Sequence, residues 1–282
     1  MPKDKSAIDE WKQKQAANFF ITQKLQERAN PAYRVPTVMQ MGENMTVEKK
    51  LPGTMLNNFA KLPGSDKTDI LNKTAHLIND MAEMEKIKTD VFPTALQEEK
   101  KVEVIFSPTA LLEEYVEKLN VFLQYASPFA FSMRQIDKVI DSANELQSIP
   151  ENPDAIYIFA HRDIHCNNML YDVSGKSLSF MDFGDSGYCE FFDALVPQFG
   201  VFENVSYELI KQFQKITTNP LFRRILSRLK SNELKEIIRI RKNKVILQNL
   251  ALVGPLLSEK AMSFDAYNMI VDIAHERISQ LQ

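Results

Sequence analysis

Cysteine and glycine are both scarce in this chain of 282 residues, which has two cysteines and eight glycines. Cys166 and Cys189 are too few for the disulfide framework that characterises small secreted domains, and they fit a reducing compartment. No glycine precedes Gly42, which excludes a glycine-rich loop upstream of that residue.

Long apolar runs and a strong excess of one charge sign are also missing. No apolar run approaches the roughly twenty residues that a membrane span needs, and the polar segment 1–14 does not resemble a secretory signal. With a formal net charge of −3, the chain has no overall electrostatic attraction to nucleic acid or to an anionic membrane. With 44% hydrophobic and 25% charged residues, the composition is that of a globular protein. We therefore expect a cytoplasmic protein without nucleic-acid or membrane partners.

Acid, amide and imidazole side chains are concentrated in two short segments, residues 161–168 (HRDIHCNN) and residues 181–185 (MDFGD). Transfer of a phosphoryl group needs a carboxylate that accepts a hydroxyl proton and oxygen ligands that hold Mg²⁺ against the phosphates. Asp163 fits the first role, and Asn168 and Asp182 fit the second. The order of these residues predicts a kinase catalytic centre.

The flanking segments predict how these residues are placed. The apolar run 155–160 is typical of a buried strand that leads into the first segment. Residues 169–181 predict a β-hairpin with its turn at 173–176, and serines alternate with apolar residues along its second strand as in a half-buried strand. Such a hairpin would bring Asn168 and Asp182 to the same end. Isolated Asp and Asn residues are usually turn formers, but this combination of strand, motif and hairpin is far more specific.

The two segments resemble the signature of the aminoglycoside phosphotransferase and choline kinase superfamily, His-x-Asp-x-His-x-x-Asn followed by an Asp-containing motif. Protein kinases share the fold but usually have Lys where this chain has His165, and they carry an Ala-Pro-Glu that is missing here. The small-molecule branch is therefore favoured, although Arg162 stands where that branch commonly has Gly.

The resemblance implies an α+β, protein-kinase-like fold, with a reduced N-terminal lobe in residues 1–52 and a mostly helical C-terminal lobe in residues 53–282. It also implies ATP or GTP with Mg²⁺, and a small-molecule hydroxyl as the phosphoryl acceptor. The hinge that meets the adenine would contain Glu48, Lys50 and Leu51. Further residues are candidates for supporting roles in the site: His161, His165, Asp185, Asp193 and Glu10.

The rest of the chain predicts a helix, a hairpin and then mainly helices. The helix covers residues 8–28, and two strands, 37–41 and 44–50, follow it. A second helix begins at Ser65, which is a plausible N-cap. Further helices are expected at 110–125, 133–146, 206–217, 220–229, 232–252 and 264–281.

A complete kinase small lobe begins with a glycine-rich loop and a strand that carries a Lys paired with a helix Glu. If helix 8–28 corresponds to that helix, Glu10 is its Glu, with Glu27 as a weaker alternative, and the strands that should come before it are absent from the sequence. Either the lobe is naturally reduced or the strands lie upstream of Met1. Two functions follow, an active phosphotransferase or a catalytically weak, kinase-like binding protein.

One dense basic region runs through residues 223–244. It predicts either a solvated helix face, which is the favoured interpretation because Glu residues interrupt the run, or an anion site for an acidic acceptor. Its cations are Arg223, Arg224, Arg228, Lys230, Lys235, Arg239, Arg241, Lys242 and Lys244.

Overall fold

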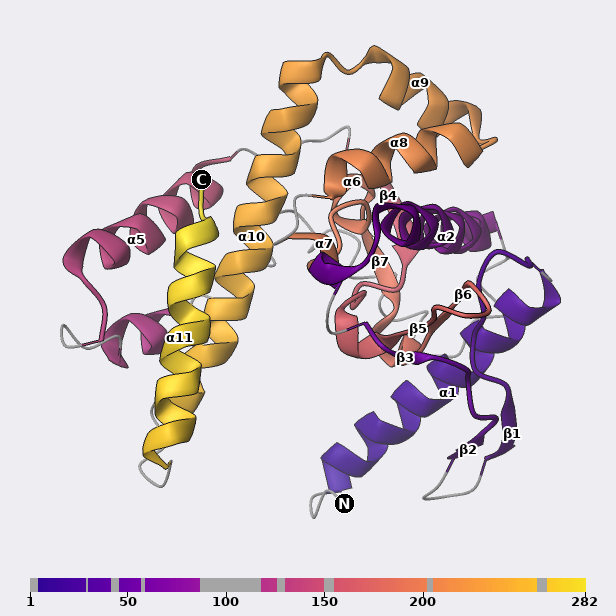
Figure 1. Cartoon of the computed structure of the whole chain (residues 1–282), viewed down its shortest axis with the longest axis horizontal. Coiled ribbons are helices and arrows are strands. Elements are labelled where there is room, and N and C mark those ends of the chain that lie inside the picture. Colours follow the sequence, from indigo (N-terminus) through magenta and orange to yellow (C-terminus); the bar gives the residue numbers. More distant parts are fainter. Residues whose placement is uncertain are drawn as a thin grey trace. The chain divides into compact units, whose positions relative to one another are not determined.

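The computed structural model describes residues 5–28, 30–41, 46–56, 59–86, 118–125, 130–149, 155–201, 205–257 and 263–282 (Figure 1). The chain divides into two compact units. The first unit comprises Met1–Glu103 and Ile156–Lys230, and the second comprises Val104–Ala155 and Ser231–Gln282. The predicted lobe boundary after residue 52 falls inside the first unit and stays a prediction. Among the described helices, none has the length and low charge needed to cross a bilayer.

The first unit begins with helix α1 (Lys5–Glu27) and an antiparallel pair of strands, β1 (Val38–Met41) and β2 (Thr46–Glu48), which confirms the predicted helix and hairpin. Phe19 and Phe20 of this helix are only half-buried. The buried positions recur at helical spacing: Ala17, Asn18, Ile21, Thr22 and Leu25. Two polar side chains therefore lie on the inner face of α1.

The predicted second hairpin is confirmed as β5 (Met169–Asp172) and β6 (Ser177–Phe180), to which β3 (Thr54–Met55) adds a third strand in the order β3-β5-β6. The backbone of Arg34 pairs with the free edge of β6, because Arg34 N–H donates to the Leu178 oxygen at 2.8 Å and its oxygen accepts from Phe180 N–H at 2.9 Å. All four residues of β6 are buried, so the expected half-burial was wrong. The segment around Arg34 covers the strand that would otherwise form the edge of the sheet.

A two-stranded sheet precedes residues 161–168, the first of the two candidate segments. β4 (Tyr157–Ala160) confirms the predicted buried strand and pairs antiparallel with β7 (Gly187–Glu190). We did not predict β7 as a strand, because its sequence GYCE lacks an apolar run. Two short helices follow β7, α6 (Phe191–Ala194) and α7 (Gln198–Val201).

Three helices complete the described part of the first unit. α2 (Gly64–Ala82) packs against α8 (Ser206–Ile216), and α9 (Pro220–Arg228) follows with Asn219 as its N-cap. The predicted N-cap at Ser65 was wrong, because α2 starts one residue earlier, directly after Pro63, and has no side-chain cap. The buried face of α2 is apolar and consists mainly of Ile70, Leu71, Ala75, Leu77, Ile78 and Met81.

The second unit is helical. Helices α10 (Ser231–Leu257) and α11 (Phe264–Gln280) lie side by side and both contact α5 (Met133–Ser148), as Figure 1 shows. Residues 118–125 are helical as predicted, while 110–117 lie outside the described residues. A Cβ at Gly254 of α10 would stand 2.6 Å from the Phe122 nitrogen, so glycine is required where α10 meets segment 118–125.

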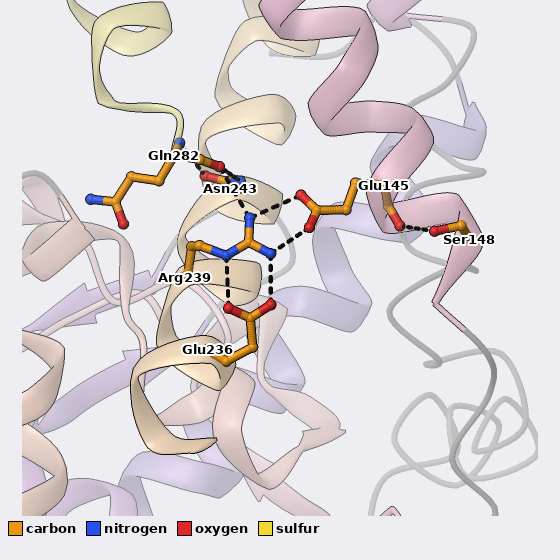
Figure 2. A network of polar contacts seen from close by, with 6 residues as sticks. All are labelled: Glu145, Ser148, Glu236, Arg239, Asn243 and Gln282. Carbon is orange, nitrogen blue, oxygen red and sulfur yellow. Dashed lines mark hydrogen bonds and ion pairs between the residues drawn. The ribbon is translucent and has the colours of Figure 1, made fainter. Parts of the chain in front are cut away.

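Figure 2 shows the polar network that fixes the end of the chain to α10. The guanidinium of Arg239 bonds the carboxylates of Glu145 and Glu236, and it donates to the backbone oxygen of Gln282 at 3.1 Å. The side chain of Asn243 makes two reciprocal bonds with the backbone of Gln282, at 2.8 and 3.1 Å. This network accounts for one of the cations of the basic region.

The basic region does not form one solvated face. Arg223, Arg224, Arg228 and Lys230 belong to the first unit and the remaining cations belong to the second. Lys242 and Lys244 are buried, at 4% and 3% exposure, and burial lowers the pKa of the Lys242 ammonium. The favoured interpretation as a solvated face was therefore wrong for these two lysines, because the middle of α10 is buried on most sides.

Candidate active site

Asp163 and Asn168 are in direct contact within the loop that joins β4 to β5. Asn168 ends a 3₁₀ turn, η4 (Cys166–Asn168), and its Nδ2 donates to Asp163 Oδ2 at 3.0 Å and to the Asp163 backbone oxygen at 3.1 Å. With the nitrogen of the amide used in this way, Asn168 Oδ1 receives no hydrogen bond from the described residues. The loop thus fixes the carboxylate of Asp163 and leaves an amide oxygen available to a cation.

The hairpin brings Asn168 next to the segment that carries Asp182, as predicted. Met181, the first residue after β6, donates its N–H to the backbone oxygen of Asn168 at 2.9 Å. Asp182 has an exposed side chain and a φ of +56°, in the left-handed region that Asp tolerates better than most residues. Two oxygen-bearing side chains distant in sequence therefore lie at one end of the hairpin.

The carboxylate of Asp163 has two further partners. His165 Nε2 lies 3.3 Å from Asp163 Oδ2, and Gln198 Nε2 donates to Oδ1 at 3.4 Å. Burial alone would raise the pKa of Asp163, but the hydrogen bonds from His165 and Asn168 and the charge of His165 together lower it below its ordinary value. The hydrogen bond to Asp163 in turn raises the pKa of His165. Asp163 is therefore ionised at neutral pH and is positioned to accept a hydrogen bond from a hydroxyl group.

His161 links the segment 161–168 to the segment 181–185. Its ring is buried, with 1% exposure, its Nε2–H donates to the backbone oxygen of Met181 at 2.8 Å, and its centroid lies 4.5 Å from that of Phe183. Burial lowers the pKa of His161, so the ring is neutral near pH 7. The predicted supporting role is consistent with this position, in which His161 orients the segment that carries Asp182.

Helix α1 is joined to the segment after Asp182 by two side chains. Asn18 Oδ1 accepts a hydrogen bond from the backbone N–H of Phe183 at 3.1 Å, while Asn18 Nδ2 donates to Glu48 Oε1 at 3.1 Å. Lys14 Nζ lies 2.9 Å from the Asp185 carboxylate. The predicted supporting residue Asp185 thus binds α1.

Gly184 lies between these two contacts and allows the backbones to approach closely. A Cβ at Gly184 would stand 3.1 Å from the Cβ of Lys14, a separation tighter than nearly all real contacts of this kind. The glycine of the MDFGD segment therefore serves the packing of that segment against α1.

The other predicted site residues lie elsewhere in the first unit. Lys50 and Leu51 line a cavity that does not include Asp163, and Glu48 is bonded to Asn18. Asp193 lies in α6, where its backbone oxygen accepts a hydrogen bond from Val196 N–H at 3.3 Å. Glu10 belongs to α1, but its side chain is outside the described part, and Glu27 is paired with Lys24. The nucleotide-binding roles of Glu48, Lys50 and Leu51 stay predictions.

Sequence reasoning missed three residues of the site: Lys14, Asn18 and Gln198. The signal for Asn18 was present, since it is a polar side chain at a position where the helical periodicity of α1 demands an inward-facing residue. Lys14 and Gln198 gave no comparable signal, because their partners lie far away in sequence and are brought close by the fold.

The arrangement suits a magnesium ion held jointly with a nucleotide. Among the described residues no group of three His, Cys, Asp or Glu side chains could hold a metal by itself. Mg²⁺, however, is commonly bound by only one or two protein oxygens, with phosphate and water completing its shell. Asn168 Oδ1 and the carboxylate of Asp182 supply oxygen atoms of the type that such a site uses.

Arg162 stands where the small-molecule branch commonly has Gly. The backbone conformation at this position explains why glycine is favoured there. Arg162 has a φ of +58°, a left-handed conformation that costs an L-residue about 1–2 kcal/mol and that glycine adopts freely. The turn that presents Asp163 is therefore formed here at the expense of local strain.

Comparison with solved structures identifies the fold. The GDP complex of wild-type aminoglycoside 2′-phosphotransferase-IIIa superposes with a TM-score of 0.63 at 13% identity, over 99% of this chain and 85% of the other. A GDP and kanamycin complex of a related aminoglycoside phosphotransferase gives 0.61 at 14% identity, over 95% and 84%. Plasmodium vivax ethanolamine kinase gives 0.54 at 14% identity, over 96% and 71%. No protein-family model and no curated protein sequence matched the chain.

These similarities confirm the predicted fold. The chain has the α+β, protein-kinase-like fold seen in these aminoglycoside phosphotransferase and ethanolamine kinase structures, so the fold that the sequence resemblance implied is confirmed.

Proposed function

We propose that the protein transfers the γ-phosphoryl group of ATP or GTP to a hydroxyl group of a small molecule. The observation that carries the proposal is the contact between Asp163 and Asn168, with Asp182 at the same end of the hairpin. An ionised carboxylate, an available amide oxygen and a second carboxylate are the groups that this reaction requires. The fold of known small-molecule kinases supports the proposal.

In this proposal each side chain has a defined role. Asp163 accepts a hydrogen bond from the acceptor hydroxyl, orients its oxygen and takes its proton as the bond to phosphorus forms. Asn168 and Asp182 would hold Mg²⁺, which when bound neutralises charge on the nucleotide phosphates. His165 and Gln198 hold the Asp163 carboxylate in place. The lowered pKa of Asp163 keeps the carboxylate ionised, and therefore able to accept that proton, at neutral pH.

Donor and acceptor are assigned by chemical class. Two of the similar structures are GDP complexes, which supports testing GTP beside ATP. The similar proteins include an aminoglycoside phosphotransferase and an ethanolamine kinase, and both kinds of substrate are alcohols that carry amino groups. We therefore propose an amino alcohol as the first acceptor class to test. A cytoplasmic location stays a prediction, with both cysteines present as free thiols.

The test compares the native chain with Asp163→Asn and with the control Asp172→Asn, the same substitution at the half-buried last residue of β5, away from Asp163. Thermal melting with MgATP or MgGTP measures nucleotide binding, since a ligand of the folded state raises its stability. Release of nucleoside diphosphate is then measured with aminoglycosides, ethanolamine and choline. Asp163→Asn should bind nucleotide normally but lose about 10²- to 10⁴-fold in turnover.

The outcomes separate the two functions that the sequence leaves open. Unchanged turnover in Asp163→Asn would show that Asp163 is not the proton acceptor. Nucleotide binding without turnover for any acceptor would support a kinase-like binding protein.

A further inference from the structure

A cavity of about 310 Å³ lies at the C-terminal end of α1, between the segments 30–37 and 49–52. It belongs to the first unit, and neither Asp163, Asn168 nor Asp182 lines it. Its volume is at the lower end of the range for small-molecule sites. Because the three main residues of the candidate active site do not line it, the cavity is a candidate for a separate binding site.

The cavity has a buried apolar floor and a cationic rim. Leu25, Tyr33 and Val35 line it and are at most 9% exposed, so they supply a fixed apolar surface. Arg34, Lys49 and Lys50 also line it, and all three are exposed. A ligand that fills the cavity would place its apolar part on the floor and its polar part among three cations.

The cationic rim is not neutralised by the described residues. No carboxylate lines the cavity, and no described acid lies within ion-pair distance of Arg34, Lys49 or Lys50. Asp80 lies behind the cavity wall, but it already accepts hydrogen bonds from Tyr33 and Asn30, both at 2.8 Å. The pKa of Asp172, which does not line the cavity, is lowered mainly by the hydrogen bond from Ser174 and only to a small extent by the charge of Arg34.

The backbone fixes two of the three cations. Arg34 is bonded on both sides to β6, through Leu178 and Phe180. Lys49 donates its backbone N–H to the oxygen of Thr37 at 2.9 Å, which joins the two segments that form the opening. The backbone positions of these two residues are thus fixed before any ligand binds, while their exposed side chains stay able to adjust to it.

We propose that this cavity is a second ligand site, which binds a small organic anion composed of a flat apolar body and a phosphate, sulfonate or carboxylate group. The apolar body would lie against Leu25, Tyr33 and Val35, and the anionic group would bind Arg34, Lys49 and Lys50. The proposal assigns Lys50 and Leu51 to this site in place of the nucleotide role that the sequence predicts for them, and it does not depend on phosphoryl transfer.

Phenyl phosphate is a suitable probe because it combines one aromatic ring with one anionic group. Its binding to the native chain is followed by ligand-observed NMR, with and without saturating MgATP, beside inorganic phosphate and the neutral benzyl alcohol. We expect phenyl phosphate to bind more tightly than either, to weaken as salt is added, and to be unaffected by MgATP.

Three single variants, Arg34→Gln, Lys49→Gln and Lys50→Gln, should each weaken binding about two- to fivefold, as expected for exposed charge pairs, and the triple variant should abolish it. Lys61→Gln, which removes an exposed cation of the same unit that does not line the cavity, should leave binding unchanged. Melting temperatures of all variants check the fold, because the substituted side chains are exposed.

Three results would overturn the proposal. Equal binding by the native chain and the triple variant would show that the cationic rim is not used. Benzyl alcohol bound as tightly as phenyl phosphate would mean that the cavity does not select anions. Displacement of phenyl phosphate by MgATP would assign the cavity to the nucleotide site.

Discussion

The side-chain oxygen of Asn18 lies 3.1 Å from the backbone nitrogen of Phe183, from which it accepts a hydrogen bond. The same amide donates to Glu48, so one buried side chain of α1 holds both the end of β2 and the residue that follows Asp182. Phe183 is fully buried, and water therefore cannot replace Asn18 as its acceptor. The position of the proposed metal-binding segment depends on this helix.

The first prediction is that Asn18→Leu destabilises the fold by about 1–3 kcal/mol, because it leaves a buried N–H without an acceptor. Turnover should fall further than stability alone explains, since Asp182 loses its fixed position. The measurements are urea unfolding and steady-state turnover. Thr22→Val, a buried control on the same face of α1 that bonds only backbone of its own helix, should lower stability without lowering the turnover of the folded protein. Equal effects of both changes on turnover would contradict the positioning role.

The second prediction separates the two tasks of Asn168, which donates to Asp163 and offers an oxygen to Mg²⁺. Asn168→Ala should lose both tasks. Asn168→Asp keeps an oxygen ligand but loses the donor, so it should retain much of the Mg²⁺-dependent nucleotide affinity while turnover stays low. Asp182→Ala should weaken MgATP binding more than Asn168→Ala does, because a carboxylate supplies charge as well as an oxygen. Calorimetric titration measures the affinities, and unchanged values in both alanine variants would remove this pair from the metal site.

The third prediction concerns the pH dependence of turnover. His165 opposes the effect of burial on Asp163, so its removal should allow the pKa of Asp163 to rise. In His165→Gln the acid limb of kcat/KM should move to higher pH, because Asp163 must be ionised to accept a proton. His275→Gln, in the second unit, should leave the profile unchanged. An acid limb that is the same in His165→Gln and the native chain would show that His165 does not set the ionisation of Asp163.

The fourth prediction concerns stability in acid. His161 and His76 have folded-state pKa values lowered below 6.5 by burial, so the unfolded chain binds protons on them first as pH falls. Their contribution is complete above about pH 6.5 and is lost as pH falls below it. The raised pKa of His165 acts in the other window, where stability present below about pH 6.5 is lost as pH rises through its folded value. Melting temperatures between about pH 5 and 8 should show a shallower acid decline for His161→Asn than for the native chain, and identical slopes would contradict the assignment.

The sequence predicted the parts of the site that depend on neighbouring residues. The hairpin between Asn168 and Asp182 could be predicted because alternation and turn residues are local signals, and the placement of Asp163 followed from the strand before it. The contacts of Asn18 with Phe183 and of Lys14 with Asp185 could not be predicted, since they depend on how α1 packs.

Errors in the prediction of burial have the same cause. The serines of β6 were expected to be exposed on the basis of alternation, but both are buried in a strand whose outer edge is paired with the chain near Arg34. Lys242 was assigned to a solvated face because it belongs to a charged run, yet it lies in the buried middle of α10. In both cases the burial depends on packing with parts of the chain that are distant in sequence. The local pattern of polar and apolar residues does not contain this information.

The last prediction tests the network of Figure 2, in which Arg239 bonds two carboxylates and the backbone of Gln282. Arg239→Lys keeps the charge, but an ammonium group cannot reproduce the paired hydrogen bonds that a planar guanidinium makes with two carboxylates at once. We expect a loss of about 1–2 kcal/mol in the stability of the second unit, because hydrogen bonds to charged groups contribute about 1.5–3 kcal/mol each but the exposure of both carboxylates reduces this.

The readout must distinguish the two units, because a chain with two compact units need not unfold in one step. Hydrogen exchange provides this distinction: in Arg239→Lys the amides of α10 and α11 should exchange faster, while those of β5 and β6 in the first unit should keep their native rates. Arg224→Lys, an exposed arginine of the first unit with no ion pair among the described residues, is the matched control and should change neither set. Unchanged exchange in α10 and α11 would show that the network contributes little to stability. Equal acceleration in both units would show that they unfold together, and the end of the chain would then stabilise the candidate active site as well.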